Sequence, residues 1–210
     1  STWFSTGGGF DYSWSPDGKW FTLEFIGNRH DPYSDIGMVS AQGGKIINLT
    51  NSGYTSGSPR WVLDGNAILF ITERYGMRAH ASWGSLNDVM LVFMNQDAYD
   101  KFRLSKEDYE LQKELEKEQK NTTEAKKNDK KKGDNKEKSE EKKEEKVKDI
   151  VVELNNIEDR IVRLTPNSSD LGSAIITKDG ETLYYLSAFE GGYDLWKMNL
   201  RKKDTKLLHK

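Results

Sequence analysis

Hydrophobic positions along the chain fall into short runs that either alternate with polar residues or are continuously apolar. Gly, Pro, Asn and Asp bound these runs, which is typical of β-strands joined by tight turns. The first part of the chain predicts four strands, at residues 10–14, 20–26, 35–39 and 46–50. The last part repeats the arrangement, with strands predicted at 173–177, 182–187, 193–198 and 205–208. The pattern therefore predicts an all-β chain made of four-stranded antiparallel units.

Three Asp-Gly turns mark the repeat. They are Asp17-Gly18, Asp64-Gly65 and Asp179-Gly180, and each leads into a strand rich in aromatic or branched residues. Glycine suits these turns because it accepts the positive φ that most residues resist. Such a repeat predicts propeller blades, at about 9–50, about 57–165 and about 171–208. Residues 1–210 are thus expected to form one incomplete β-propeller of about three blades, because a closed ring needs at least about four.

An insertion at about 98–149 interrupts the second unit. Apolar runs at 67–72 and 88–94 predict strands before it, and a run at 161–165 predicts the closing strand after it. Leu164-Thr165 repeats the Leu49-Thr50 pair that ends the first unit. The insertion is therefore expected to lie inside the second blade and not between two domains.

The insertion has a helical start and a highly charged continuation. Ser105-Lys106-Glu107-Asp108 matches a capping box, which predicts the start of a helix. From about residue 116 to residue 148 the composition is Lys, Glu, Asn and Asp with scarcely an apolar residue. Such a segment buries too little surface to offset its ordering entropy and is predicted to be disordered. A solvated spacer and a charged docking tether both fit this composition.

Composition and charge argue against several classes of function. The chain is 35% hydrophobic and 31% charged, with a formal net charge of −2, which gives no electrostatic support for binding to nucleic acid. It has no cysteine, which excludes disulfide bonds, thiolate nucleophiles and Cys-based metal sites. No apolar run approaches transmembrane length, and residues 1–4 do not resemble a signal peptide.

The sequence predicts no catalytic residue, no metal ion and no cofactor within this chain. His30, His80 and His209 lack metal-ligand spacing, and no serine lies in a Gly-x-Ser-x-Gly motif. Aromatic residues at strand positions are expected in the core between blades and not on a base-stacking or sugar-binding surface. These are Trp14, Trp20, Trp61, Tyr184, Tyr185 and Trp196.

The loop at 74–83 is the main candidate for ligand binding. It carries Arg74, Arg78, His80 and Trp83, and its guanidinium groups could hold a peptide carboxylate. Its predicted place between the second and third strands of a blade puts it on one end face of a propeller. The alternative is that Trp83 and Met77 pack the loop on the next blade while the arginines pair with local acids.

Arg29 and His30 occupy the corresponding loop of the first unit and are further peptide-binding candidates.

The repeated motif resembles that of a known class of propellers. Trp14-Ser15-Pro16-Asp17-Gly18-Lys19, followed by a hydrophobic strand and later by Leu-Thr, resembles the WD-like repeats of TolB and of tricorn-type proteases. Three further segments are similar to stretches of bacterial tricorn-like serine peptidases: 76–85, 95–102 and 153–162. The resemblance covers nearly the whole chain outside the Lys/Glu run.

The resemblance implies a non-catalytic propeller region of a tricorn-like serine peptidase. Such a region would gate or channel peptides and dock the catalytic region, which nothing in this chain matches. Its implied partners are peptides or unfolded protein substrates and the catalytic region of the same polypeptide. The resemblance is also compatible with a homo-oligomer. The alternative is a TolB-like protein-interaction scaffold with no peptidase attached. Bacterial relatives imply a periplasmic or otherwise exported protein, whereas the intracellular archaeal tricorn leaves a cytoplasmic location as the alternative.

Overall fold

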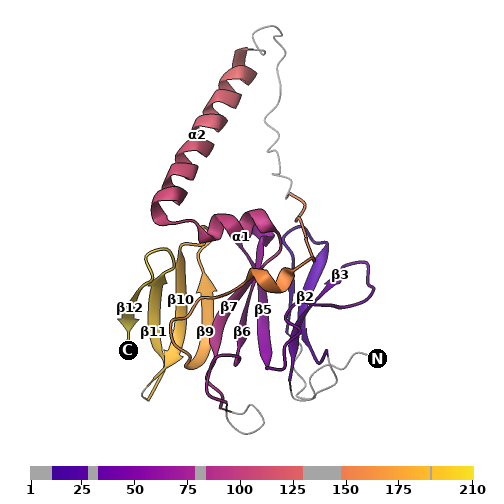
Figure 1. The fold of residues 1–210 in the computed structure, drawn as a ribbon, viewed down its shortest axis with the longest axis vertical. Helices are drawn as coiled ribbons and strands as arrows, with labels where there is room; N and C mark the ends of the chain where they lie inside the picture. The colour runs from indigo at the N-terminus through magenta and orange to yellow at the C-terminus, as the bar shows by residue number, and fades with distance from the viewer. Residues whose placement is uncertain (1–10, 28–32, 79–83, 130–147, 190) are drawn as a thin grey trace, which may run out of the picture. The chain divides into compact units, whose positions relative to one another are not determined.

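The computed structural model describes residues 11–27, 33–78, 84–129, 148–189 and 191–210 (Figure 1). Within this part of the chain the strands form three four-stranded antiparallel sheets. In each sheet the strands follow one another in chain order from one edge to the other. The predicted all-β architecture of three four-stranded blades is therefore confirmed.

The strands lie where the hydrophobic pattern predicts them. Blade 1 contains β1 (Tyr12–Trp14), β2 (Trp20–Phe25), β3 (Asp35–Ser40) and β4 (Ile47–Asn48). Blade 2 contains β5 (Ser56–Val62), β6 (Ala67–Thr72), β7 (Asp88–Phe93) and β8 (Ile161–Arg163). Blade 3 contains β9 (Asp170–Ile176), β10 (Thr182–Ala188), β11 (Asp194–Asn199) and β12 (Asp204–His209). Strands β4 and β8 end earlier than predicted. The threonine that follows each strand, Thr50 or Thr165, donates a hydrogen bond to a buried aspartate instead of continuing the strand pairing.

The three Asp-Gly turns adopt the backbone that their glycines allow. The φ angle is 68° at Gly18, 88° at Gly65 and 72° at Gly180. In blades 1 and 3 a hydroxyl group closes the turn, since Ser15 Oγ donates to Asp17 Oδ1 at 2.6 Å and Thr177 Oγ1 donates to Asp179 Oδ1 at 2.6 Å. In blade 2 the corresponding residue is Val62, which has no hydroxyl, and the turn is a 3₁₀ helix, Leu63–Gly65 (η1).

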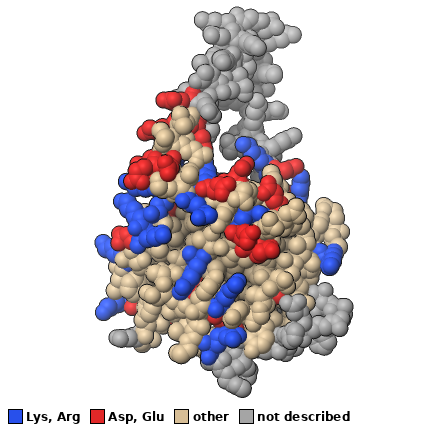
Figure 2. Space-filling view, in the orientation of Figure 1, with Lys and Arg blue, Asp and Glu red and all other residues tan. Residues whose placement is uncertain are grey.

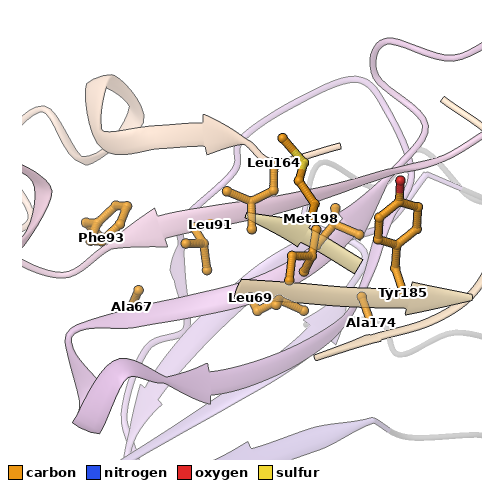
Figure 3. Packing of buried hydrophobic residues seen from close by; sticks show 10 residues of the cluster. Ala67, Leu69, Leu91, Phe93, Leu164, Ala174, Tyr185 and Met198 are labelled. Atoms are coloured by element: carbon orange, nitrogen blue, oxygen red, sulfur yellow. The ribbon is translucent and has the colours of Figure 1, made fainter. Parts of the chain in front are cut away.

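Apolar side chains fill the space between neighbouring blades. Between blades 1 and 2, Ile36 and Met38 of β3 belong to one buried cluster with Phe70 of β6 and Met90 of β7. Between blades 2 and 3, strands β6 and β7 supply Leu69 and Leu91, while Ala174, Tyr185 and Met198 come from β9, β10 and β11 (Figure 3). All of these residues are at most 6% exposed. Blade 2 is thus covered on both faces, which explains the continuously apolar sequence of β7.

The chain inserted into blade 2 begins with a short helix that packs on the blade. Helix α1 (Gln96–Arg103) starts after Asn95, whose Oδ1 accepts a hydrogen bond of 2.8 Å from Ala98 N. The Phe93 ring at the end of β7 lies 5.8 Å from the Tyr99 ring and 5.0 Å from the Phe102 ring. The aromatic face of α1 therefore anchors the start of the insertion.

The second helix of the insertion is longer than predicted. Helix α2 (Lys106–Asp129) begins at the predicted capping residue, since Ser105 Oγ accepts a hydrogen bond of 3.1 Å from Asp108 N. It continues past residue 116, where the composition predicted the onset of disorder. Lys, Glu, Gln and Ala have high helix propensity and form i,i+4 pairs such as Lys106–Glu110, which favours a helix even without an apolar core. Residues 130–147 lie outside the described residues.

Contacts divide the chain into two compact units. One comprises Ser1–Phe102 and Lys148–Lys210, and the other comprises Arg103–Val147.

Hydrogen bonds of Ile150 and Arg160 help to hold the segment that returns from the insertion onto the blades. Ile150 N donates to Asp17 Oδ2 at 3.0 Å, and the buried Arg160 guanidinium donates to the carbonyls of Phe93, Asn155 and Glu153. Burial of Asp17 opposes its ionisation, but hydrogen bonds from Ser15 and from the backbone outweigh this effect. The pKa of the Asp17 carboxyl therefore lies below its ordinary value.

Candidate functional site

The candidate binding loop connects β6 to β7 at the end of blade 2 opposite η1. The backbone of Arg74 to Arg78 is described, whereas His80 and Trp83 lie outside the described residues, as do Arg29 and His30 in the corresponding loop of blade 1. The structure therefore places only Arg74 and Arg78 of the six residues that the sequence selected. Lys and Arg side chains extend to this end of the molecule in Figure 2.

Hydrogen bonds fix both ends of the described part of this loop. Glu73 N donates to Thr55 O at 3.1 Å, and Thr55 N donates to Glu73 Oε1 at 3.2 Å. On the other side, Leu86 N donates to Met77 O at 2.9 Å. A Cβ atom at Gly76 would lie 1.9 Å from the carbonyl oxygen of Leu86, so this close approach requires glycine.

The arginine side chains of the loop lie over tyrosine rings. The Arg78 guanidinium carbon is 4.8 Å from the centre of the Tyr54 ring, and that of Arg74 is 5.7 Å from the Tyr75 ring. Met77 is 77% exposed. Among the described residues neither Arg74 nor Arg78 forms an ion pair, whereas Trp83, on which the alternative packing of the loop also depends, lies outside the described residues. Stacking leaves the edges of each guanidinium group directed to hydrogen-bond acceptors in solvent or in a ligand.

A third arginine, which the sequence did not single out, lies beside this pair. Arg163 at the end of β8 has its guanidinium carbon 5.3 Å from the Tyr75 ring. Its Nε and one terminal nitrogen are each 2.9 Å from Oδ1 of Asp88, the fully buried first residue of β7. Asp88 also accepts hydrogen bonds of 2.7 Å from the hydroxyl groups of Thr165 and Ser168. Asp88 therefore neutralises Arg163 and fixes it under the loop.

Blade 1 contains the same kind of buried aspartate. Asp35, the first residue of β3, accepts a hydrogen bond of 2.7 Å from Thr50 Oγ1 and one of 2.8 Å from Asn48 Nδ2. Asn48 thus occupies in blade 1 the place that Arg163 occupies in blade 2. The recurring Leu-Thr pair was the available sequence signal for this network, and comparing the residues that precede it would have identified Arg163.

The described part of the site is a surface of arginine side chains that lie over tyrosine rings. A small pocket between blades 1 and 2 is lined by polar residues such as Ser52, Thr72 and Arg74, and it has room for about one water molecule. No group of three or more His, Asp or Glu residues in the described ranges could hold a metal ion. The arrangement of guanidinium groups and tyrosine rings suits recognition of carboxylates and extended backbone.

Comparisons with known proteins agree with the fold. The chain is similar to the tricorn protease, with a TM-score of 0.57 and 11% identity over 95% of this chain and 18% of that one. It is also similar to TolB from Acinetobacter baumannii, with a TM-score of 0.50 and 14% identity over 95% of this chain and 32% of that one.

One curated protein matches in sequence over a short stretch. The chain is 39% identical over 59 residues to the "Uncharacterized peptidase YuxL" of Bacillus subtilis (strain 168), which is 28% of this chain and 9% of that protein. No protein-family model matches the chain. The chain thus spans a third or less of each of these proteins. Its fold is an incomplete β-propeller, similar to the propellers of TolB and the tricorn protease.

Proposed function

We propose that this chain is the non-catalytic propeller region of a tricorn-like serine peptidase, in which it gates or channels peptides and docks the catalytic region. The observation that carries the proposal is the likeness of fold to the tricorn protease over 95% of the chain. The local identity to a Bacillus subtilis protein named as a peptidase supports the same class.

Peptides would contact the end of blade 2 that carries Arg74 and Arg78. Both guanidinium groups are exposed and are held over tyrosine rings, so part of their conformational freedom is already lost before a ligand binds. Guanidinium groups form paired hydrogen bonds with carboxylates, which suits a peptide carboxylate or an acidic side chain. His80 and Trp83 of the same loop, with Arg29 and His30 of blade 1, belong to this proposed surface.

Peptidase assays of two proteins test whether the catalytic activity lies outside this chain. The 210-residue chain and the full-length polypeptide that carries it are each incubated with a mixed peptide pool, and cleavage is followed by mass spectrometry. Activity in the full-length protein alone is the expected result. Activity of the chain by itself would overturn the proposal, because a catalytic site would then lie within these residues.

Peptide binding tests the surface itself. The Arg78→Ala variant is expected to lose at least about tenfold in affinity for acidic peptides, since a charge-assisted hydrogen bond contributes about 1.5–3 kcal/mol. The matched control is Lys178→Ala, which removes an exposed cation at the opposite end of the blades, where Lys178 pairs with Asp64. Equal affinities of the wild type and Arg78→Ala would rule out this surface.

The second candidate is a TolB-like interaction scaffold without a peptidase. The similarity of fold to TolB from Acinetobacter baumannii supports this second candidate. The full-length polypeptide separates the two candidates. A processing-peptidase serine region on that polypeptide supports the first, and further blades without such a region support the second.

We also propose export to the periplasm, with the cytoplasm as the alternative. In the described ranges, no helix combines the length and apolar character that crossing a membrane requires. Fractionation of cells that express the full-length protein, followed by immunoblotting, distinguishes the two compartments.

A further inference from the structure

Met77 differs from the other methionines of the chain in its exposure to solvent. Four of the five methionines belong to the buried clusters between blades and are at most 6% exposed: Met38, Met90, Met94 and Met198. Met77, in the loop between β6 and β7, is 77% exposed. Among the large hydrophobic residues that the structure describes, it has the largest exposed fraction. The candidate binding loop therefore presents one flexible apolar side chain to solvent.

The backbone holds Met77 in this exposed position. Leu86 N donates to Met77 O at 2.9 Å, and Gly76 N donates to Glu73 O at 3.3 Å. Gly76 also approaches Leu86 so closely that an added Cβ would lie 1.9 Å from its carbonyl oxygen. Met77 is thus exposed although its backbone is held against the returning chain.

The neighbours of Met77 combine apolar and cationic character. Tyr75 is 51% exposed. Arg78 is exposed, with its guanidinium carbon 4.8 Å from the centre of the Tyr54 ring. Met77 and Arg78 together offer a ligand an apolar contact through the thioether and charge-assisted hydrogen bonds through the guanidinium group. Because the methionine side chain is unbranched and polarisable, it adapts to apolar partners of different shapes.

We propose that Met77 is the apolar contact of the peptide-binding surface and makes peptide binding sensitive to oxidation. The ligand that fits this arrangement is a peptide with an apolar side chain next to the carboxylate that Arg78 binds. Oxidation of Met77 by hydrogen peroxide weakens the binding of such a peptide. This inference rests on the proposed function, since it adds a selectivity and a regulation to the same surface.

The oxidation transfers one oxygen atom to Sδ of Met77. The O–O bond of hydrogen peroxide breaks, the thioether is oxidised by two electrons to a sulfoxide, and the peroxide is reduced to water. A sulfoxide is polar, so covering it with an apolar side chain carries a desolvation cost that covering the thioether does not. The chain has no cysteine, so no thiol of this chain competes for the peroxide.

Peptide mapping tests the reactivity of Met77 without any ligand. The chain is treated with hydrogen peroxide for increasing times, digested and analysed by mass spectrometry. Met77 is expected to be oxidised at least about tenfold faster than each of the four buried methionines, because peroxide reaches its sulfur atom from solvent. Equal rates at all five positions would overturn the proposal.

Two labelled peptides test the selectivity. Each contains one aspartate, and the residue beside it is leucine in one peptide and serine in the other. The chain is expected to bind the leucine peptide at least about fivefold more tightly, because apolar surface is buried against Met77. Peroxide is expected to remove this preference, and reduction by a methionine sulfoxide reductase with a thiol reductant is expected to restore it. A preference that persists after complete oxidation of Met77 would contradict the proposal.

Variants at position 77 separate the oxidation of Met77 from other effects of peroxide. Met77→Leu keeps an apolar side chain without an oxidisable sulfur, so its preference for the leucine peptide is expected to survive peroxide. Met77→Gln is polar, as the sulfoxide is, and is expected to lack the preference before any treatment. The matched control is Met198→Leu, which removes a buried methionine and should lose its preference on oxidation as the wild type does. Loss of the preference in oxidised Met77→Leu would assign the effect to another group.

Arg78→Ala separates this inference from the proposed function. If Arg78→Ala weakens the binding of both peptides while Met77→Gln binds them as the wild type does, the surface binds peptides and Met77 has no part in it. If Arg78→Ala also binds both peptides as the wild type does, the proposed surface is excluded and this inference with it.

Discussion

Asp88 and Thr165 are joined by a hydrogen bond of 2.7 Å although 77 positions separate them in the sequence. Asp88 begins β7, before the insertion, and Thr165 follows β8, after it. In blade 1 the corresponding bond, from Thr50 to Asp35, is also 2.7 Å long but spans only 15 positions. The same polar contact therefore closes both blades, and in blade 2 it does so across a segment that belongs largely to a separate compact unit.

Removing the buried carboxylate should destabilise blade 2 strongly. Asp88→Ala leaves Arg163 without its charge partner and the hydroxyl groups of Thr165 and Ser168 without their acceptor. Breaking a buried ion pair from one side costs about 3–5 kcal/mol, and we expect a loss of about 3 kcal/mol because Arg163 is one-third exposed. Urea unfolding measures it. A loss below about 1 kcal/mol would mean that the network does not close the blade.

An exposed ion pair provides the control for this substitution. Asp64 and Lys178 lie 3.2 Å apart, with side chains 68% and 81% exposed. Asp64→Asn should change the free energy of unfolding by no more than about 1 kcal/mol, since exposed pairs contribute little.

The glycines of the Asp-Gly turns should differ in their tolerance of alanine. Gly18 and Gly65 both have positive φ, but only Gly65 is crowded, since an added Cβ would lie 2.3 Å from Cδ1 of Ile150. Gly18→Ala is expected to cost about 1 kcal/mol from backbone strain alone. Gly65→Ala should cost about 1–3 kcal/mol more, because the added methyl overpacks the turn. Thermal unfolding of the two variants, measured side by side, checks the order. Equal destabilisation would show that Ile150 moves aside freely.

The sheets could be predicted from the sequence because local signals agree with one another. Alternating apolar residues, Asp-Gly turns and the repeated Leu-Thr pair all indicate four-stranded units, and each strand of blade 3 lies within a few residues of its prediction. The length of α2 could not be predicted by the same reasoning. The absence of apolar residues predicts disorder, whereas the Lys/Glu composition also has a high intrinsic helix propensity.

The candidate site could be predicted only in part, because its geometry depends on contacts between distant residues. Arg74 and Arg78 are close in sequence, so the sequence predicts that they lie together. Tyr54 comes from the connection between blades 1 and 2, and Arg163 comes from the strand that follows the insertion. Only the folded blade brings these residues to one end of the sheet.

The insertion should be dispensable for the stability of blade 2. Residues 103–147 form a separate compact unit, and the contacts of Arg160 and Ile150 that hold the returning chain lie outside it. Replacing 104–147 by a flexible Gly/Ser linker should change the free energy of unfolding by less than about 1 kcal/mol, because loop-closure entropy varies slowly with length. The control is Arg160→Ala, which should cost about 3 kcal/mol by leaving the buried carbonyl of Phe93 and the part-buried carbonyls of Asn155 and Glu153 without a donor. Similar losses in both variants would mean that the insertion supports the blade.

Glu24 of β2 should make the stability of the chain depend on pH. Its carboxylate approaches β5 so closely that a Cβ at Gly57 would lie 2.6 Å from Oε2. Burial raises the pKa of Glu24 above the value of 4.5 for an unperturbed glutamate; hydrogen bonds from Ser34 and from the Ser58 backbone oppose this, and the nearby charge of Asp11 reinforces it. The folded state therefore binds the proton more tightly than the unfolded state does.

The stabilisation from protonated Glu24 is fully present below the unfolded-state pKa and is lost as the pH rises through the folded-state pKa. Glu24→Gln removes this loss, so its stability relative to the wild type should increase between about pH 4 and about pH 7. Urea midpoints across this range measure the difference. A Glu24→Gln profile parallel to the wild type would show that the carboxylate stays solvated at the junction of blades 1 and 2.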